Sequence, residues 1–68
     1  MKAPERVVVN VADLVFGDDV AHQSFGRVRV DIIIPQPTGD IEVFFRRPRD
    51  NAVFAATFLS SARVVVVR

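Results

Sequence analysis

The sequence contains no cysteine, no tryptophan and no tyrosine, and it has a single histidine, His22. Without cysteine, the chain can form neither a disulfide nor a thiolate metal site. A chain of 68 residues hides only about 60% of the surface that its unfolded form exposes, and cores of this size rarely supply more than about 3–5 kcal/mol unaided. Since covalent and metal staples are missing, we expect association with a second copy to add stability.

The chain also lacks a surplus of charge of one sign and a long apolar run. Nine basic and eight acidic side chains give a net charge of +1, so no strong global field attracts nucleic acid or a membrane surface. No apolar run approaches the roughly 20 residues that a membrane span requires. The segment Met1–Arg6 has no apolar stretch of the kind found in signal peptides. We therefore expect a cytoplasmic protein with no membrane partner.

Hydrophobic residues, by contrast, make up 50% of the chain, and fourteen of them are valine. The branched side chain of valine suits a pleated sheet and loses rotamer freedom in a helix. Composition and length together predict one small β-rich domain over residues 1–68, with more apolar surface than so small an interior can hide.

The clearest pattern spans residues 26–47. Apolar residues alternate with polar ones from Gly26 to Ile34 and again from Ile41 to Arg46, and a segment with two prolines and a glycine separates the two runs. This arrangement predicts a β-hairpin. The register that keeps one face apolar joins three pairs of residues: Ile34 with Ile41, Ile32 with Val43, and Val30 with Phe45. A slip of one residue would place an isoleucine against Glu42, so the pattern favours this pairing.

The remaining segments complete a small antiparallel sheet. Residues 7–16 are apolar on both alternating faces, which predicts a strand covered on two sides. Residues 20–25 are ambiguous between a loop and a short helical turn, and residues 63–68 predict a final strand. Residues 53–60 favour a strand over a helix, although Asp50 or Asn51 could cap a helix there.

Two folds follow from these segments. The favoured one is all-β, a five-stranded antiparallel sheet or a partly open barrel whose layout resembles small SH3-like barrels. The alternative is α+β, with a four-stranded sheet and one helix at about residues 51–62.

Arginines gather on the face of the hairpin that points away from the predicted core. In the expected register Arg29 lies directly opposite Arg46, and like charges directly across a sheet are destabilising. A bound anion would relieve them, and Phe44 on the same face could stack a base. The candidate anion or nucleic-acid site comprises Arg27, Arg29, Phe44, Arg46, Arg47 and Arg49. The favoured interpretation is that Asp31 and Glu42 neutralise a solvated face.

Other candidate sites are weaker. Asp18, Asp19 and His22 lie within five residues, but a turn is rich in aspartate for conformational reasons, so no metal site and no cofactor are expected. The few serines and threonines have no recognisable base partner, and we expect no catalytic residues and no enzyme.

Two features suggest contact with a partner. Phe44 alone among the phenylalanines is predicted to face away from the core. The terminal strand, which contains Val64, Val65, Val66 and Val67, would aggregate if left as an exposed edge, so it is expected to lie in the middle of the sheet or against a partner chain.

These observations favour a non-catalytic interaction or assembly module that is homo-oligomeric or docks on another protein. A small nucleic-acid-binding barrel that uses the arginine face is the alternative. A ligand pocket between subunits, lined by phenylalanine and valine, is a weaker third possibility.

Overall fold

The computed structural model describes residues 5–68. Residues 1–4, which belong to the segment expected to carry no signal peptide, lie outside this range. The described chain forms one antiparallel sheet of six strands and no α-helix. The all-β class is therefore confirmed, with one strand more than expected, and the α+β alternative is wrong. The elements in chain order are β1 (Arg6–Asn10), the 3₁₀ turn η1 (Val11–Asp13), β2 (Asp19–His22), β3 (Gly26–Pro35), β4 (Ile41–Arg47), β5 (Ala52–Phe58) and β6 (Arg63–Val67).

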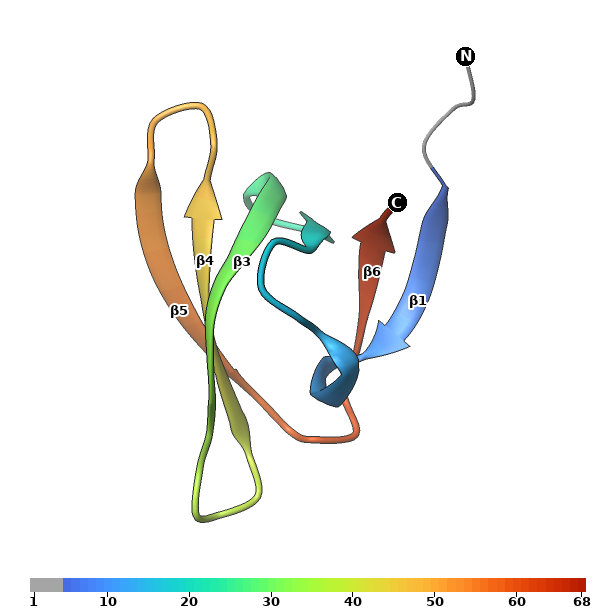
Figure 1. Cartoon of the computed structure of the whole chain (residues 1–68), viewed down its shortest axis with the longest axis vertical. Helices are drawn as coiled ribbons and strands as arrows, with labels where there is room; N and C mark the ends of the chain where they lie inside the picture. The colour runs from blue at the N-terminus through green and yellow to red at the C-terminus, as the bar shows by residue number, and fades with distance from the viewer. Residues whose placement is uncertain (1–4) are drawn as a thin grey trace.

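The sheet is open, and its strand order is β1-β6-β2-β3-β4-β5. Figure 1 shows the wing formed by β3, β4 and β5 on one side and the pair β1 and β6 on the other. The short strand β2 connects them, because it pairs with β3 over four residues and with β6 over two. The last strand therefore lies inside the sheet, between β1 and β2, as one of the two placements expected for it. The two edges are β1 and β5.

One face of the sheet, called the inner face here, carries the core. Its buried side chains come from the 3₁₀ turn, the loop after it and every strand except β1 and β5: Val11, Leu14, Val20, Val28, Val30, Ile41, Val43, Phe45 and Val66. Phe45 is the largest of the fully buried side chains. The opposite face is called the outer face.

The β3–β4 hairpin follows the predicted register for only part of its length. Arg29 lies opposite Arg46 and Val30 opposite Phe45, as expected. A β-bulge at Asp31 then shifts the pairing by one residue, so that Ile32 pairs with Phe44 instead of Val43. The expected pairs of Ile32 with Val43 and of Ile34 with Ile41 are wrong.

The bulge also changes which isoleucines face the core. A bulge inserts one extra residue into one strand and bends it, so the alternation of β3 restarts after Asp31. Ile33 packs against the core, whereas Ile32 and Ile34 lie on the outer face with 51% and 40% of their surface exposed. The expectation that Ile32 and Ile34 share the core face with Val28 and Val30 is therefore wrong.

Residues 7–25 also differ from expectation. The single strand predicted over residues 7–16 ends at Asn10, because Val11–Asp13 form a 3₁₀ turn in which Val11 is buried. The strand β1 is an edge, and its residues alternate between exposed and half-buried, so it is covered on one face only. The ambiguous segment at residues 20–25 contributes part of β2, which is the sixth strand.

The segment predicted at residues 53–60 contains the strand β5, as favoured; the strand ends at Phe58 and pairs with β4 without a bulge over seven residues. The turn before it closes on Asn51, whose φ of 59° lies in the left-handed region that asparagine tolerates better than most residues. The Asn51 N–H donates a hydrogen bond of 2.8 Å to the carbonyl oxygen of Arg47. This turn fixes the register of the β4–β5 hairpin.

Candidate functional site

The arginines at one end of the sheet are paired with aspartates. Nη2 of Arg27 donates to Oδ2 of Asp19 at 2.8 Å, and Nε of Arg29 donates to Oδ1 of the same carboxylate at 3.3 Å. Nη2 of Arg46 donates to Oδ2 of Asp31 at 3.0 Å. The like charges of Arg29 and Arg46, which do lie opposite each other, are therefore each balanced by a neighbouring carboxylate.

Asp31 neutralises Arg46 as the sequence suggests, but Glu42 does not take part. Glu42 lies opposite Ile34 and Thr57 and forms no ion pair among the described residues. The second carboxylate is Asp19, which sequence reasoning grouped with His22. The sequence alone does not show this contact, because Asp19 lies opposite Arg29 only once β2 has paired with β3.

Arg47 and Arg49 lie apart from the other members of the predicted set. Since side chains alternate along a strand, Arg47 lies on the face of Phe45, opposite to the face of Arg46. Its guanidinium makes two hydrogen bonds to the carboxylate of Asp50, at 2.9 and 2.7 Å. Arg49 lies in the exposed turn between β4 and β5. Of the six predicted residues, the structure therefore brings Arg27, Arg29, Phe44 and Arg46 to the outer face, but not Arg47 and Arg49.

These contacts lower the pKa of two aspartates. The hydrogen bond from Arg27, assisted by Arg29, holds the pKa of Asp19 below its ordinary value against the opposing effect of burial. The hydrogen bond from Arg47, together with the backbone N–H of Ala52, lowers the pKa of Asp50 to about 2. Both carboxylates stay ionised at neutral pH and remain bound to arginine.

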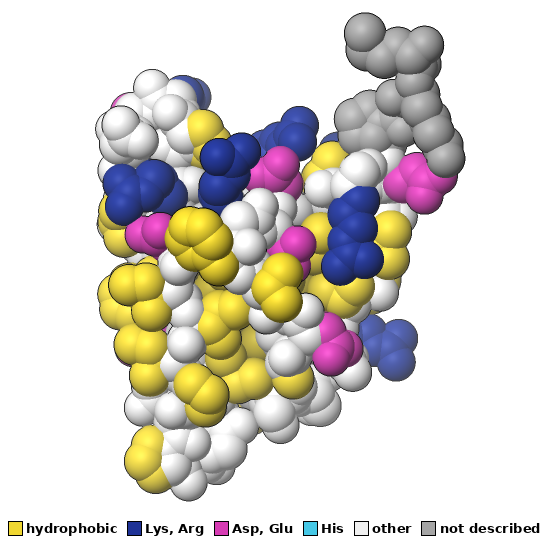
Figure 2. All heavy atoms as spheres, in the orientation of Figure 1, with side chains coloured by type: hydrophobic (Ala, Val, Ile, Leu, Met, Phe, Trp, Pro, Cys, Tyr) yellow, Lys and Arg dark blue, Asp and Glu magenta, His cyan; other side chains and the backbone are white. Residues whose placement is uncertain are grey.

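A second feature of the outer face is apolar. Four of its side chains, called the outer apolar patch here, lie on neighbouring strands: Ile32 and Ile34 on β3, Phe44 on β4, and Val53 on β5. Val53 is 50% exposed, and Phe44 is half-buried. In Figure 2 hydrophobic side chains gather over the wing of β3 to β5, while basic and acidic side chains lie side by side near its upper end. Contiguous exposed apolar surface on a small protein is typical of an interaction site.

Sequence reasoning identified only Phe44 of this patch. It faces away from the core as expected, but it is not the only such phenylalanine, because Phe16 and Phe25 are exposed by 75% and 42%. Ile32 and Ile34 were assigned to the core because strict alternation hides the bulge. The interruption of an apolar run by Asp31 was the one available signal.

The valines of β6 lie inside the sheet. Val66 is fully buried, and Val64, Val65 and Val67 are half-buried between β1 on one side and, at the end of the strand, β2 on the other. Most of the backbone of β6 is therefore paired with neighbouring strands of the same chain.

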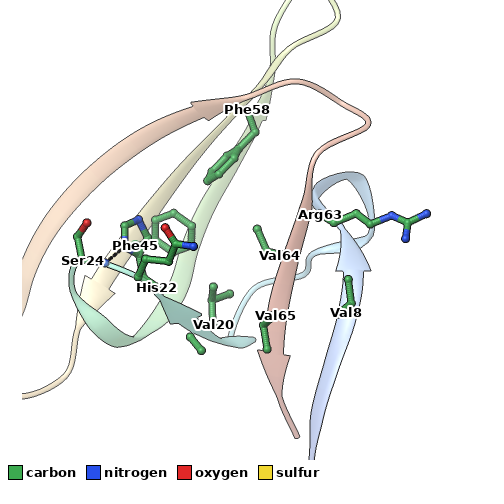
Figure 3. Close-up of a pocket in the computed structure, with 11 residues that line it drawn as sticks. Val8, Val20, His22, Ser24, Phe45, Phe58, Arg63, Val64 and Val65 are labelled. Atoms are coloured by element: carbon green, nitrogen blue, oxygen red, sulfur yellow. Dashed lines mark hydrogen bonds between the residues drawn. The ribbon is translucent and has the colours of Figure 1, made fainter.

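A cavity of about 300 Å³ opens between β6 and the β4–β5 hairpin (Figure 3). Phe45 and Phe58 face it from one side and Val64 from the other, with His22 beside Phe45. Nδ1 of His22 accepts a hydrogen bond of 3.1 Å from the Ser24 N–H. The imidazole lies with its ring centroid 5.0 to 6.2 Å from three phenylalanine rings, which makes it part of an aromatic cluster.

The other two members of the group considered for a metal point elsewhere. Asp18 accepts a hydrogen bond of 3.0 Å from the Val15 N–H, and Asp19 binds the two arginines. Over residues 5–68 no three His, Asp or Glu side chains are grouped closely enough to hold a metal ion.

No protein-family model matches the sequence, and no curated protein or solved structure matches it significantly. Within the described part of the chain there is no helix of the length and apolarity needed to cross a membrane.

Proposed function

We propose that this chain is a non-catalytic assembly module that acts as a homo-oligomer. The observation that supports the proposal is the outer apolar patch, which lies beside a free edge of the sheet and is left uncovered by the described chain. Burying an exposed aliphatic or aromatic side chain completely contributes about 1.5–3 kcal/mol, and covering the exposed half of each contributes correspondingly less. A second chain that covers several of them would add stability comparable with that of the small core itself.

The small size of the interior supports the same proposal. Nine residues form the buried core over residues 5–68, and the chain has no cysteine with which to cross-link them. Proteins that bind the folded state shift the folding equilibrium towards it. A partner subunit therefore supplies the stabilisation that this sequence cannot obtain from a disulfide.

The alternative function, a nucleic-acid-binding barrel, requires arginines that are free to meet phosphates. Here Arg27, Arg29, Arg46 and Arg47 already bind aspartates, and a phosphate would have to compete with these carboxylates. The net charge of +1 adds little long-range attraction. We therefore favour the assembly module, and propose the cytoplasm as its location, as expected from the sequence.

Light scattering over a wide range of protein concentration tests the proposal. We expect an average mass that rises from one chain towards an oligomer as concentration increases, and a mass of one chain at every concentration would contradict it. Anisotropy of a labelled single-stranded oligonucleotide provides the second arm. Binding that weakens with salt and disappears in Arg29→Ala/Arg46→Ala would favour the nucleic-acid function instead.

A further inference from the structure

The edge strand β5 has none of the features that normally protect a sheet edge. Natural edges are short, charged, interrupted by proline or distorted by a bulge. The seven residues of β5 include no charged residue and no proline, and its ladder with β4 is continuous. The other edge, β1, has five residues and begins with Arg6. A long, uncharged edge of this kind is a template for pairing with another strand.

We propose that two copies of this chain pair through β5, antiparallel and across a two-fold axis at Ala55, so that one sheet continues through both. This inference rests on the proposed function, because it names the partner and the surface of the homo-oligomer. Centring the pair on Ala55 uses all seven residues of each strand, and a two-fold contact brings the same patch of both subunits together.

Side chains across this seam complement each other in size. On the inner face, antiparallel pairing about Ala55 places Phe54 opposite the partner's Ala56 and Phe58 opposite the partner's Ala52. A large side chain therefore always meets a small one. On the outer face, Val53 lies opposite the partner's Thr57, and both are β-branched residues that favour a pleated surface.

The outer apolar patch continues across the seam. Ile32, Phe44 and Ala55 lie in one row, and the two-fold axis extends that row through the partner's Ala55 to the partner's Phe44. The two alanines are small, so each Phe44 ring can lie over the seam and bury surface that one chain alone leaves half-exposed.

Charges on the outer face complement each other in the same arrangement. Arg46 lies beside Val53 and Glu42 beside Thr57, so the axis puts Arg46 in one row with the partner's Glu42. Three strand spacings separate the two residues, about 14 Å between their Cα atoms, so the opposite charges attract each other across the seam without a direct ion pair. Glu42 has no ion pair within the described residues, while Arg46 stays bound to Asp31.

Disulfide trapping tests the pairing directly, because the chain has no cysteine of its own. Residues directly opposite in an antiparallel pair have Cα atoms about 4.5–5.5 Å apart, within the range that a disulfide bridges. We expect Ala55→Cys to form a cross-linked dimer under mild oxidation that reductant reverses. The matched control is Val8→Cys, an exposed position on the other edge strand, and we expect it to stay mostly monomeric on a non-reducing gel.

A charge substitution provides the second test. Ala55→Lys places two lysines directly opposite each other on the two-fold axis, where like charges are destabilising, and we expect the dimer dissociation constant to rise by about tenfold or more, which corresponds to about 1.4 kcal/mol. Val8→Lys adds the same charge to β1 and is expected to leave the constant unchanged. Far-UV circular dichroism confirms that both variants keep the fold.

The outcomes separate this inference from the proposed function. If the unmodified chain dimerises but Ala55→Lys leaves the dimer intact and Ala55→Cys does not cross-link, the β5 pairing is wrong while the assembly function stands. Cross-linking of Val8→Cys in place of Ala55→Cys would move the interface to β1 and likewise overturn it. A chain that stays monomeric at all concentrations overturns both.

Discussion

At the scale of single residues, Asp19 and Asp50 decide how the arginine end of the sheet behaves. Each carboxylate accepts hydrogen bonds from arginine, and each has a lowered pKa. The arginines are thereby held in place and partly neutralised. A cluster of cationic residues in the sequence thus becomes a set of ion pairs in the fold.

These two aspartates predict how stability depends on pH. The folded-state pKa lies below the ordinary value of 3.8 for Asp19, and at about 2 for Asp50. At pH values between the folded-state pKa and the ordinary pKa, the unfolded chain therefore binds more protons than the folded chain. Their contribution is fully present above about pH 4 and is lost as the pH falls through the folded-state pKa, towards about 2 in the case of Asp50.

Urea unfolding at a series of pH values measures this effect. We expect the free energy of unfolding to fall between about pH 4 and pH 2, and to fall less steeply in Asp19→Asn. Asp13→Asn changes an exposed residue that makes no ion pair among the described residues and serves as the control. Equal slopes in the chain and in Asp19→Asn would show that the arginine contacts of Asp19 do not influence folding.

At the scale of elements, the bulge in β3 determines which side chains meet the core. Before Asp31 the strand presents Val28 and Val30 inward, and beyond it Ile33 takes that role. Strict alternation from the sequence would have chosen Ile32. A single inserted residue therefore brings half of the outer apolar patch, Ile32 and Ile34, to the outer face.

A pair of neighbouring substitutions tests this change of face. We expect Ile33→Asp to destabilise the fold by more than about 2 kcal/mol, because it moves a charge against the core. Ile32→Asp changes an exposed side chain and is expected to alter the stability of the monomer by about 0.5 kcal/mol or less. Chemical denaturation at low protein concentration measures both, and the opposite ranking would mean that the alternation continues unbroken through Asp31.

Local pattern was sufficient for the elements whose apolar period is regular. The β3–β4 hairpin, β5 and β6 all follow from period-two alternation or from runs of β-branched residues. The strand β2 does not, because the four residues Asp19–His22 are too few to show a period and gain strand structure only by pairing with β3 and β6. The end of β1 is hidden for a similar reason, since the 3₁₀ turn at Val11–Asp13 interrupts an apolar run without a glycine or proline.

At the scale of the whole molecule, the strand order could not be predicted. β6 follows β5 in the chain after a tight turn, with Ala62 N–H donating to Leu59 at 2.9 Å, yet it pairs with β1 and β2. Periodicity is a local signal and does not encode which strands become neighbours. The candidate site depends less on this order, because its aspartate partners and its apolar patch come from the consecutive strands β2 to β5.

Thermal unfolding extends the assembly proposal to the whole molecule. If the native state is a dimer, its melting temperature rises with protein concentration, because mass action favours the associated folded form. We expect this rise in the unmodified chain and in Val8→Lys, whereas in Ala55→Lys it begins at a protein concentration about tenfold higher. A melting temperature that is independent of concentration in all three would indicate that folding and association are not coupled.

The two edges of the open sheet differ in length and charge, and this difference limits the size of the assembly. Joining β5 to its own counterpart uses up that edge in both molecules, so assembly stops at a closed pair that still ends in β1 on either side. Joining β5 to β1 would instead leave one free edge of each kind after every addition, and the product would be an endless fibre. The difference between a finished particle and a polymer thus depends on β5 preferring its own copy to the arginine-headed strand at the other end.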